Sequence, residues 1–318
     1  MTQMTGLIFT DAQQAIGFAR PALYRTHSTV MEEKYPAFQY AKYIPTNEDG
    51  DMWDVGTVVT SLNGPAGRAE YLSGKGFDIP NVSAQMSQGV SNFYLAGCGY
   101  ELSLQEVNRA SKMGIDINTR DASDARKIAE KFIYDRAMTG STEKGFTGLL
   151  NNATVPTANV PADGTGSVTS WSAKNADQKA RDINLALTDV YTATKETELA
   201  DTLLLPTSSF LDASTTRMGD TGMTVLAFLQ QNNAYTAITG LPLNIMPARE
   251  LETAGAGGTK RMVAYARNPG ILEFFLPGAF TFLPLHPLSS MSWRVDGIMN
   301  VGQTEIYRPK GISYRDGI

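Results

Sequence analysis

The chain has 318 residues, enough for about two domains of ordinary size or one large irregular one. Charged residues make up 19% and hydrophobic residues 42% of the chain, a composition that excludes a largely disordered protein. Its 27 Lys and Arg residues are outnumbered by 32 Asp and Glu residues, and the formal net charge of -5 leaves no global positive field to hold nucleic acid.

Cysteine and histidine are scarce, which removes several classes of function. Cys98 is the single cysteine and cannot form a disulfide within the chain, which argues against a secreted, disulfide-stabilised scaffold. The two histidines, His27 and His286, supply too few ligands and bases for most zinc sites and catalytic triads. The sequence contains neither a signal-peptide pattern nor an apolar run of about 18 residues, so we expect a cytoplasmic origin and no membrane span.

The amino-terminal region, residues 1–44, carries no sustained helical pattern and includes Pro21 and Pro36. This predicts an extended arm. Its basic and aromatic residues alternate too sparsely for a platform that stacks single-stranded bases, so we expect the arm to pack on protein.

A long excursion follows the arm. An acidic turn at residues 47–51 leads into a strand-like run at residues 53–62, which ends in the turn signal Asn63-Gly64-Pro65. Strand-like sequence resumes at residues 90–102, so residues 53–88 are predicted to form a two-stranded projection. Two strands bury too little apolar surface to be stable alone, and this projection must therefore pack on something else.

Two helices are predicted next. The Ser-x-x-Glu pattern at residues 103–106 is a capping box that opens a short helix ending at Gly114. Residues 121–139 form a long amphipathic helix, with Asp121 as its N-cap and Gly140 as its end.

The second half of the chain mixes helices and strands. After a polar loop at residues 152–170, we predict a helix at residues 173–199 capped by Ser172, a buried strand at residues 203–206 and a helix at residues 221–232. Because helices and strands do not alternate regularly and no repeat is present, the predicted class is α+β. Five short β-rich runs close the chain, at residues 241–246, 261–266, 271–276, 292–295 and 304–307.

The motifs that suggest chemistry are incomplete. Gly97-Cys98-Gly99 lacks the third glycine and the following helix of a dinucleotide site, and the chain has no phosphate-binding loop. Asp49, Asp51 and Asp54 lack the spacing of a calcium loop, so we expect a solvated turn there. The sequence therefore predicts no metal, no cofactor and no catalytic site.

An arm and an excursion without cores of their own are attached to a body of low charge. Such elements find partners on neighbouring copies, because burial on assembly offsets the entropy lost in ordering them. Contacts of this kind close into rings or shells when the geometry permits. The residues alone therefore favour self-assembly.

The order of these parts resembles that of the major capsid protein of tailed double-stranded DNA phages, which has the Hong Kong 97-type fold. Residues 1–43 resemble its N-arm, residues 53–88 its extended E-loop, residues 121–139 its spine helix, and residues from 173 onward its axial domain. The segment Gly145-Phe146-Thr147-Gly148-Leu149-Leu150-Asn151 is similar to a Gly-x-x-Gly-Leu-Leu-Asn stretch that follows the spine helix in many of these proteins.

The closing segment, from Tyr265 to Ile318, resembles the tail of a capsid-protein family formerly catalogued as an uncharacterised phage surface protein. Together the similarities imply a Hong Kong 97-like fold that covers nearly the whole chain. They imply five regions: an N-terminal arm at residues 1–45, a strand and E-loop hairpin at 46–102, a peripheral domain with the spine helix at 103–150, an axial domain with interleaved strands at 151–290, and a return to the peripheral domain at 291–318.

The resemblance implies a viral structural protein that is no enzyme and needs no cofactor. Such a major capsid protein assembles as pentamers and hexamers into an icosahedral shell around packaged double-stranded DNA, which it encloses without sequence-specific binding. Its place is the virion after assembly in the host cytoplasm, and its further partners are scaffold, portal and decoration proteins. This chain lacks the long charged coiled-coil prefix of some relatives, so either scaffolding is a separate protein or residues 1–41 suffice.

The same resemblance places contacts between subunits in the E-loop region. Some relatives also crosslink a loop Lys to an Asn of a neighbour; Lys75 and Asn300 lie in suitable regions, but no motif fixes such a pair, and we expect a solvated Lys75. The predicted contact residues are Trp53, Arg68, Glu70, Tyr71, Lys75 and Phe77.

Two alternatives remain open. An encapsulin nanocompartment would share the fold and enclose a cargo enzyme instead of a genome. A soluble hydrolase would use residues 53–88 as a lid and His286 as its base.

Overall fold

The computed structural model describes residues 38–62, 69, 71, 86–113, 117–163, 166, 168–219 and 222–318. Residues Phe38–Ile318 form one compact unit that mixes helices and strands, as the sequence predicts. In the described part of the chain, no helix is both long and apolar enough to cross a membrane.

The first described element carries the end of the predicted arm into the core. Helix α2 (Tyr40–Tyr43) is a single turn and is followed by Ile44, whose side chain is fully buried. The Tyr265 hydroxyl donates a hydrogen bond of 2.6 Å to the carbonyl of Tyr43. Residues 38–44 therefore pack on the body, and the remainder of the predicted arm lies outside the described residues.

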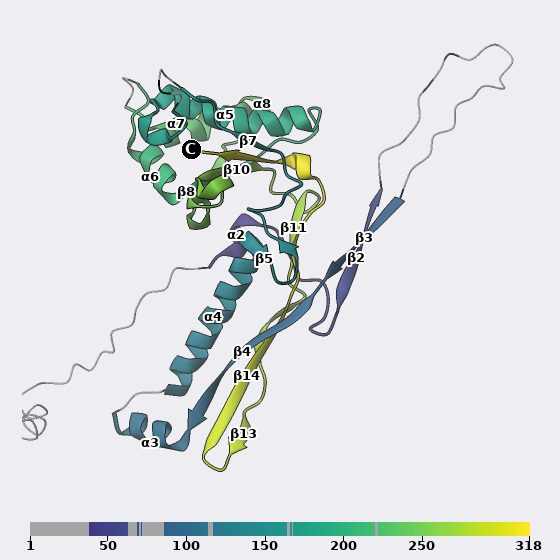
Figure 1. Ribbon diagram of the computed structural model, residues 1–318, viewed down its shortest axis with the longest axis vertical. Helices are drawn as coiled ribbons and strands as arrows, with labels where there is room; N and C mark the ends of the chain where they lie inside the picture. Colours follow the sequence, from purple (N-terminus) through teal and green to yellow (C-terminus); the bar gives the residue numbers. More distant parts are fainter. Residues whose placement is uncertain are drawn as a thin grey trace, which may run out of the picture. The chain divides into compact units, whose positions relative to one another are not determined.

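A five-stranded mixed sheet lies at the centre of one end of the unit, close to helices α5 to α8 (Figure 1). Strand β8 (Thr202–Pro206) pairs in parallel with β9 (Asn244–Ala248) and antiparallel with β10 (Arg261–Tyr265). Strand β10 pairs antiparallel with β16 (Ile312–Asp316), which pairs in parallel with β7 (Thr157–Asn159). Every residue of β8 and β10 is buried, so the leucine run of β8 is the buried strand that its composition predicts.

The two faces of this sheet pack into two separate apolar cores. Because successive strand residues point to opposite faces, Leu203 and Leu205 belong to one core and Leu204 to the other. The core that contains Leu204 also includes Ile133 and Met138 of the long helix α4 (Ile117–Thr139). The other core is formed with helices α5 (Ala176–Ala193), α6 (Thr207–Thr215), α7 (Val225–Gln231) and α8 (Ala234–Thr239).

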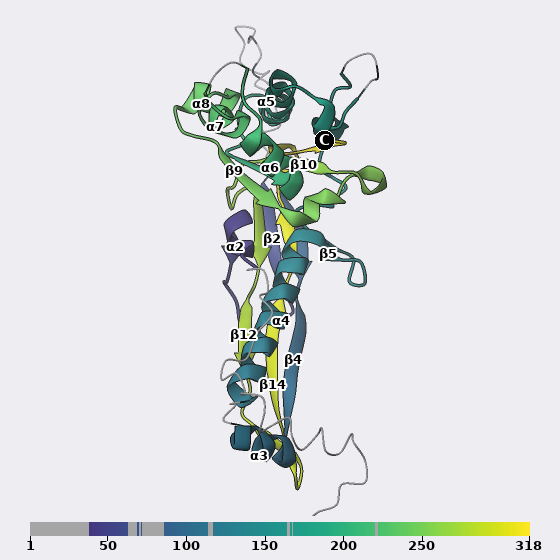
Figure 2. The same cartoon turned by 90° about the vertical axis from the view of Figure 1, so that its left-hand side faces the viewer.

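Helix α4 runs along a second, elongated sheet, as both Figure 1 and Figure 2 show. Strands β4 (Tyr94–Ser103) and β14 (Ser292–Val301) pair antiparallel over their full length. The Cys98 thiol of β4 contacts the carbonyl oxygen of Ala125 in α4 at 3.3 Å, so alternate β4 residues face the helix. The sheet is completed by β12 (Gly278–Phe282) and β13 (His286–Ser289), and α3 (Leu104–Met113) follows β4.

The predicted excursion is a two-stranded hairpin of β2 (Gly56–Leu62) and β3 (Met86–Asn92), and its tip lies outside the described residues. Two smaller sheets connect the parts: β1 (Thr46–Asn47) with β11 (Leu272–Phe275) and β15 (Thr304–Ile306), and β5 (Gly140–Ser141) with β6 (Phe146–Thr147). Short 3-10 helices lie at Trp171–Ala173, Arg249–Glu252, Ala256–Gly258 and Pro309–Gly311.

Several predicted boundaries are wrong. Ser172 lies inside a 3-10 helix, and the cap of α5 is Asn175. The Asn175 side chain accepts a hydrogen bond of 2.9 Å from the Gln178 N–H, and the Asn175 N–H donates one of 2.9 Å to the Gln178 side chain. Asp121 lies within α4, which begins at Ile117. The single run at residues 90–102 is divided between β3 and β4, which have different partners.

Other predicted boundaries are confirmed. The Ser103 hydroxyl accepts a hydrogen bond of 3.2 Å from the Glu106 N–H, and the Glu106 carboxylate accepts one of 2.8 Å from that hydroxyl. Helix α4 ends at Gly140, which adopts a left-handed φ of 72°. The helix predicted at residues 221–232 is present but shorter, with Thr224 as its N-cap.

Candidate assembly surfaces

The end of α4 explains the motif at residues 145–151. The hairpin of β5 and β6 turns back over the last turn of the helix, and a Cβ on Gly148 would lie 2.3 Å from the carbonyl oxygen of Met138. The Asn151 side chain donates a hydrogen bond of 2.6 Å to the Thr139 carbonyl and accepts one of 2.7 Å from the Gly148 N–H. Glycine and asparagine are therefore required here by the closure of the helix end.

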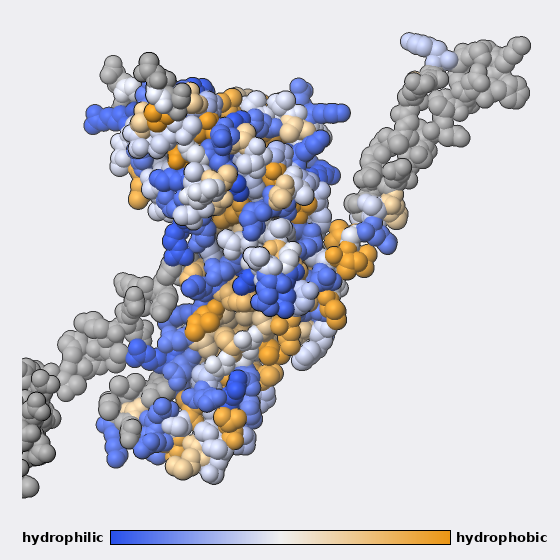
Figure 3. Space-filling view, in the orientation of Figure 1, coloured by the Kyte–Doolittle hydropathy of each residue, from blue (hydrophilic) through white to orange (hydrophobic). Residues whose placement is uncertain are grey.

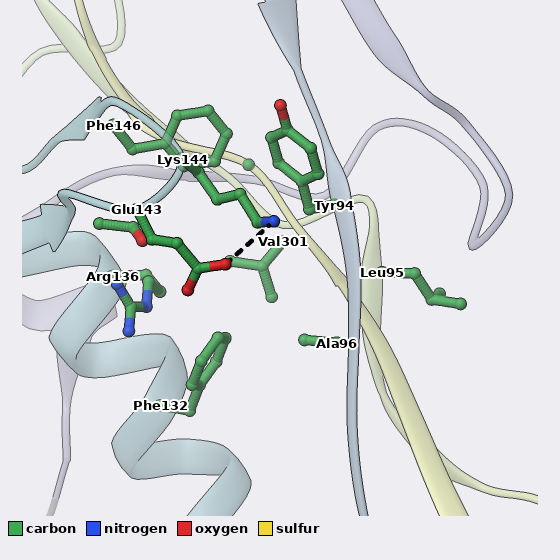
Figure 4. A pocket seen from close by; sticks show the side chains of 11 residues that line it. Tyr94, Leu95, Ala96, Phe132, Arg136, Glu143, Lys144, Phe146 and Val301 are labelled. Atoms are coloured by element: carbon green, nitrogen blue, oxygen red, sulfur yellow. Dashed lines mark ion pairs between the residues drawn. The ribbon is translucent and has the colours of Figure 1, made fainter.

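A small cavity, the junction pocket, lies between this hairpin, α4 and the start of β4 (Figure 4). The Lys144 ammonium lies 5.3 Å from the ring centre of Tyr94, and the Arg136 guanidinium lies 4.7 Å from that of Phe132. Glu143 pairs with Lys144 at 3.2 Å. With a volume of about 110 Å³, the pocket can take one side chain of a partner but no organic cofactor.

The hairpin of β2 and β3 has one apolar face. Val58 and Val90 are directly opposite each other in the ladder and are 60% and 68% exposed. Met86, two pairs further along the same face, is 65% exposed. On the other face Ser91 is buried, so the exposed apolar face lacks a partner among the described residues.

A second apolar area lies where α3 meets the turn between β13 and β14. The N–H of Leu104 donates a hydrogen bond of 2.9 Å to the carbonyl of Met291, which joins the two elements. Figure 3 shows apolar surface on this part of the body. Contiguous apolar areas of this kind mark interaction sites in soluble proteins. The exposed apolar side chains here are Leu104, Val107, Leu285, Leu288 and Met291.

The predicted contact residues are only partly described. Trp53 and Tyr71 are strongly exposed, which suits a contact with another molecule. Arg68, Glu70, Lys75 and Phe77 lie outside the described residues. The prediction missed Val58 and Val90. Val58 and Val59 are adjacent in β2, and the apolar residues Met86 and Val90 of β3 are separated by Ser87, Gln88 and Gly89, so neither strand has the regular alternation that would have identified the exposed face.

Among the described residues, those that suggested chemistry do not assemble into a site, and His27 lies outside the described residues. His286 lies on an exposed strand, with Nε2 3.8 Å from the Asp296 carboxylate. Burial raises the pKa of the Cys98 thiol, which keeps it protonated and poorly nucleophilic. In the described part of the chain, no three metal-ligating side chains lie together.

Asn300 is nearly inaccessible, and its side-chain amide donates a hydrogen bond of 2.8 Å to the Asp54 carbonyl. This contact fixes the base of the hairpin on β14. The possible crosslinking partner Lys75 lies outside the described residues, so this pair stays untested.

Comparison with solved structures shows likenesses in architecture to capsids and related particles. The capsid of Myoviridae phage XM1 is similar with a TM-score of 0.79 at 14% sequence identity, over 99% of this chain and 100% of that chain. The capsid of the native GTA particle has a TM-score of 0.61 at 10% identity, over 95% and 98%. The virus-like particle from Pyrococcus furiosus has a TM-score of 0.53 at 13% identity, over 86% and 90%.

These likenesses confirm the Hong Kong 97-type fold that the order of elements implies. No curated protein matches the chain in sequence. A family model described as major capsid protein matches residues 67–318, which is well over half of the chain. The protein therefore belongs to the family of major capsid proteins.

Proposed function

We propose that this capsid protein assembles as pentamers and hexamers into an icosahedral shell around packaged double-stranded DNA. The observation that carries the proposal is the β2–β3 hairpin, a two-stranded projection with an exposed apolar face. Two strands are at best marginally stable alone, so this face needs a partner surface on another copy. The six predicted contact residues Trp53, Arg68, Glu70, Tyr71, Lys75 and Phe77 belong to the same proposal.

The proposed shell is assembled in the host cytoplasm and becomes the capsid of the virion. It encloses DNA by confinement, since a net charge of -5 opposes tight general binding of a polyanion. The proposed further partners are scaffold, portal and decoration proteins. A role without catalysis is supported by the family, whose members are structural, and by the scattered positions of His286 and Cys98.

The five proposed regions follow the resemblance: residues 1–45, 46–102, 103–150, 151–290 and 291–318. The separation of two apolar cores by the five-stranded sheet supports a peripheral and an axial domain. An encapsulin compartment is the less favoured alternative, because the matching family is that of major capsid proteins.

The apolar face of the hairpin gives the direct test. Val58→Lys combined with Val90→Lys places two charges on the exposed face without removing a buried side chain. We expect the subunit to fold normally and the fraction in capsomers or shells to fall at least tenfold, because a buried, unpaired charge at an interface is costly. Light scattering after size exclusion, with electron microscopy, measures this fraction.

Ser87→Lys is the matched control, since Ser87 lies on the opposite face of the same hairpin. Assembly of the control should stay close to wild type. Equal loss in both variants would mean that any added charge in the hairpin is harmful, and unchanged assembly of the double variant would remove the hairpin face from the proposal.

A further inference from the structure

A cavity separate from the apolar surfaces lies at the end of α5. It has a volume of about 590 Å³ and lies between that helix end and the 3-10 helix Pro309–Gly311; we call it the basic groove. Its walls include the apolar groups of Pro156, Ala193 and Pro309. A cavity of this size accommodates several side chains of a partner, including one aromatic ring.

The groove is positively charged. Lys195, Arg308 and Lys310 line it together with one carboxylate, Glu198, which pairs with Arg308 at 2.5 Å. Lys195 and Lys310 are exposed and form no ion pair with a described carboxylate. Two cations therefore remain for an acidic partner.

The backbone beside the groove is held in an unusual conformation. Lys195 and Glu196 both have left-handed φ angles, 55° and 65°, although neither is glycine. The Thr194 hydroxyl donates a hydrogen bond of 2.8 Å to the carbonyl of Val190 and accepts one of 3.2 Å from the Glu198 N–H. Residues in such conformations persist where their surroundings hold them, and they cluster at binding sites.

The chain contains an acidic segment that lacks a basic partner among the described residues. The turn between β1 and β2 carries Glu48, Asp49, Asp51 and Asp54, all of which are exposed. Its shape is fixed by internal hydrogen bonds: the Asp54 carboxylate accepts from the Asp51 N–H at 2.7 Å. Next to these charges Trp53 is 69% exposed, and tryptophan is enriched among residues that dominate interface energies.

We infer that the basic groove of one copy receives the acidic turn, residues 48–54, of a second copy. The inference rests on the proposed assembly and specifies one contact within it. The two unpaired lysines match the acidic side chains, and the proline and alanine walls suit the Trp53 ring. A nucleic acid strand is the poorer occupant, because the groove contains the carboxylate of Glu198 and lacks an extended row of cations.

Disulfide trapping tests the contact directly. In a Cys98→Ala background, a tagged chain carrying Lys310→Cys is co-assembled with an untagged chain carrying Asp51→Cys, so that any tagged-to-untagged crosslink joins two copies. Oxidised glutathione supplies the oxidant. We expect at least tenfold more of this crosslink than with the control Lys131→Cys, which replaces an exposed lysine on α4. A yield no higher than the control overturns the inference.

Charge exchange tests the electrostatic part. Lys195→Glu with Lys310→Glu, or Asp49→Lys with Asp51→Lys, should each weaken association of subunits at least tenfold, and the four changes together should restore most of it. Reversal of sign on both sides keeps the attraction, whereas a structural defect would add to the loss. Absence of restoration overturns the inference.

The outcomes separate this contact from the proposed function. Failure of the wild-type chain to assemble contradicts the proposed function itself. Normal wild-type shells without the crosslink contradict only the inferred contact. A third outcome would assign the groove to DNA and overturn the inference. In it, the groove variant assembles normally but carries less nucleic acid, and the turn variant assembles normally and carries the usual amount.

Discussion

At the scale of single residues, Gly148 permits the close packing of the following chain on the end of the spine helix α4. Gly148 crosses the last turn of α4 so closely that a Cβ would lie 2.3 Å from the Met138 carbonyl oxygen and 2.6 Å from the Thr139 nitrogen. Both neighbours are backbone atoms, which cannot move aside by changing a rotamer. The Gly-x-x-Gly-Leu-Leu-Asn motif is thus a packing requirement at a helix end.

Gly148→Ala should destabilise the unassembled subunit by about 1–3 kcal/mol, the usual cost of overpacking a tight site. Urea denaturation followed by circular dichroism measures the change. Gly222→Ala is the control, because Gly222 has an ordinary φ and no atom within 4 Å of the added Cβ. An equal loss of stability in both variants would show that the close approach at Gly148 is not the cause.

A buried ion pair holds the last strand in place. The Arg261 Nε donates a hydrogen bond of 2.6 Å to the Asp316 carboxylate, and the Arg261 Nη1 donates another of 2.6 Å to the carbonyl of Leu150. Burial alone would raise the pKa of Asp316, but the hydrogen bonds from Arg261 and from the Ala256 N–H outweigh it and hold that pKa below its ordinary value. The carboxylate is therefore charged in the folded protein at neutral pH.

This pKa direction predicts acid sensitivity with a definite sign. A carboxyl group whose folded pKa is depressed stabilises the protein fully above its unfolded pKa of about 3.9, and the stabilisation is lost as pH falls below that value. Asp316→Asn should remove this part of the pH dependence and cost about 3–5 kcal/mol at pH 7, because Arg261 would be left buried and unpaired. Urea denaturation at pH 7 and at pH 3 measures both effects.

Asp296→Asn serves as the control for this prediction. Asp296 pairs with Arg294 at 2.6 Å, but both side chains are substantially exposed, so the expected cost is below about 1 kcal/mol. A similar cost for both variants would contradict the special role of the buried pair.

At the scale of elements, local sequence patterns correctly predicted helices and strands whose type does not depend on which other element they pack against. The amphipathic stripe of α4 and the leucine run of β8 each identify an element without knowledge of the rest of the fold. The predicted start of α4 is wrong because Asp is a residue type that often caps helices, whereas Asp121 lies inside a helix that already begins at Ile117.

Elements whose partners lie far away in the chain were harder to predict. Residues 90–102 read as one strand, yet β3 pairs with β2 whereas β4 pairs with β14, nearly two hundred residues later. Helix α6 was missed because its Ser and Thr residues have low helix propensity, which burial of Ala213 overrides. Sequence did not predict β16 as a separate strand, because its position in the sheet depends on pairing with β10 and β7.

The candidate surfaces also differ in whether local sequence can predict them. Sequence predicted a two-stranded excursion between residues 53 and 88, and it named Trp53 as a contact residue, a role that the strong exposure of its side chain suits. It did not identify the basic groove, because Lys195 and Lys310 are brought together only when the end of α5 meets the 3-10 helix Pro309–Gly311. Single basic residues separated by more than a hundred positions carry no local signal of such a cavity.

At the scale of the whole molecule, one subunit combines a stable sheet with a hairpin that lacks a core. Strand β10 is buried completely and paired on both sides, whereas β2 and β3 have no other strand partner in the part of the chain that the structure describes. Elements with few buried contacts open at low free-energy cost, and well-buried strands open only with global unfolding. Assembly should therefore change the opening of the hairpin and leave that of the central sheet nearly unchanged.

Hydrogen exchange measured on unassembled subunits and on shells tests this difference. We expect the amides of Gly56–Leu62 and Met86–Asn92 to exchange at least tenfold more slowly in shells, since tenfold corresponds to about 1.4 kcal/mol of added protection. The amides of β10 should remain strongly protected in both states. Equal hairpin exchange in subunits and shells would show that the apolar face of the hairpin stays uncovered after assembly, and the partner surface proposed for it would then have to be abandoned.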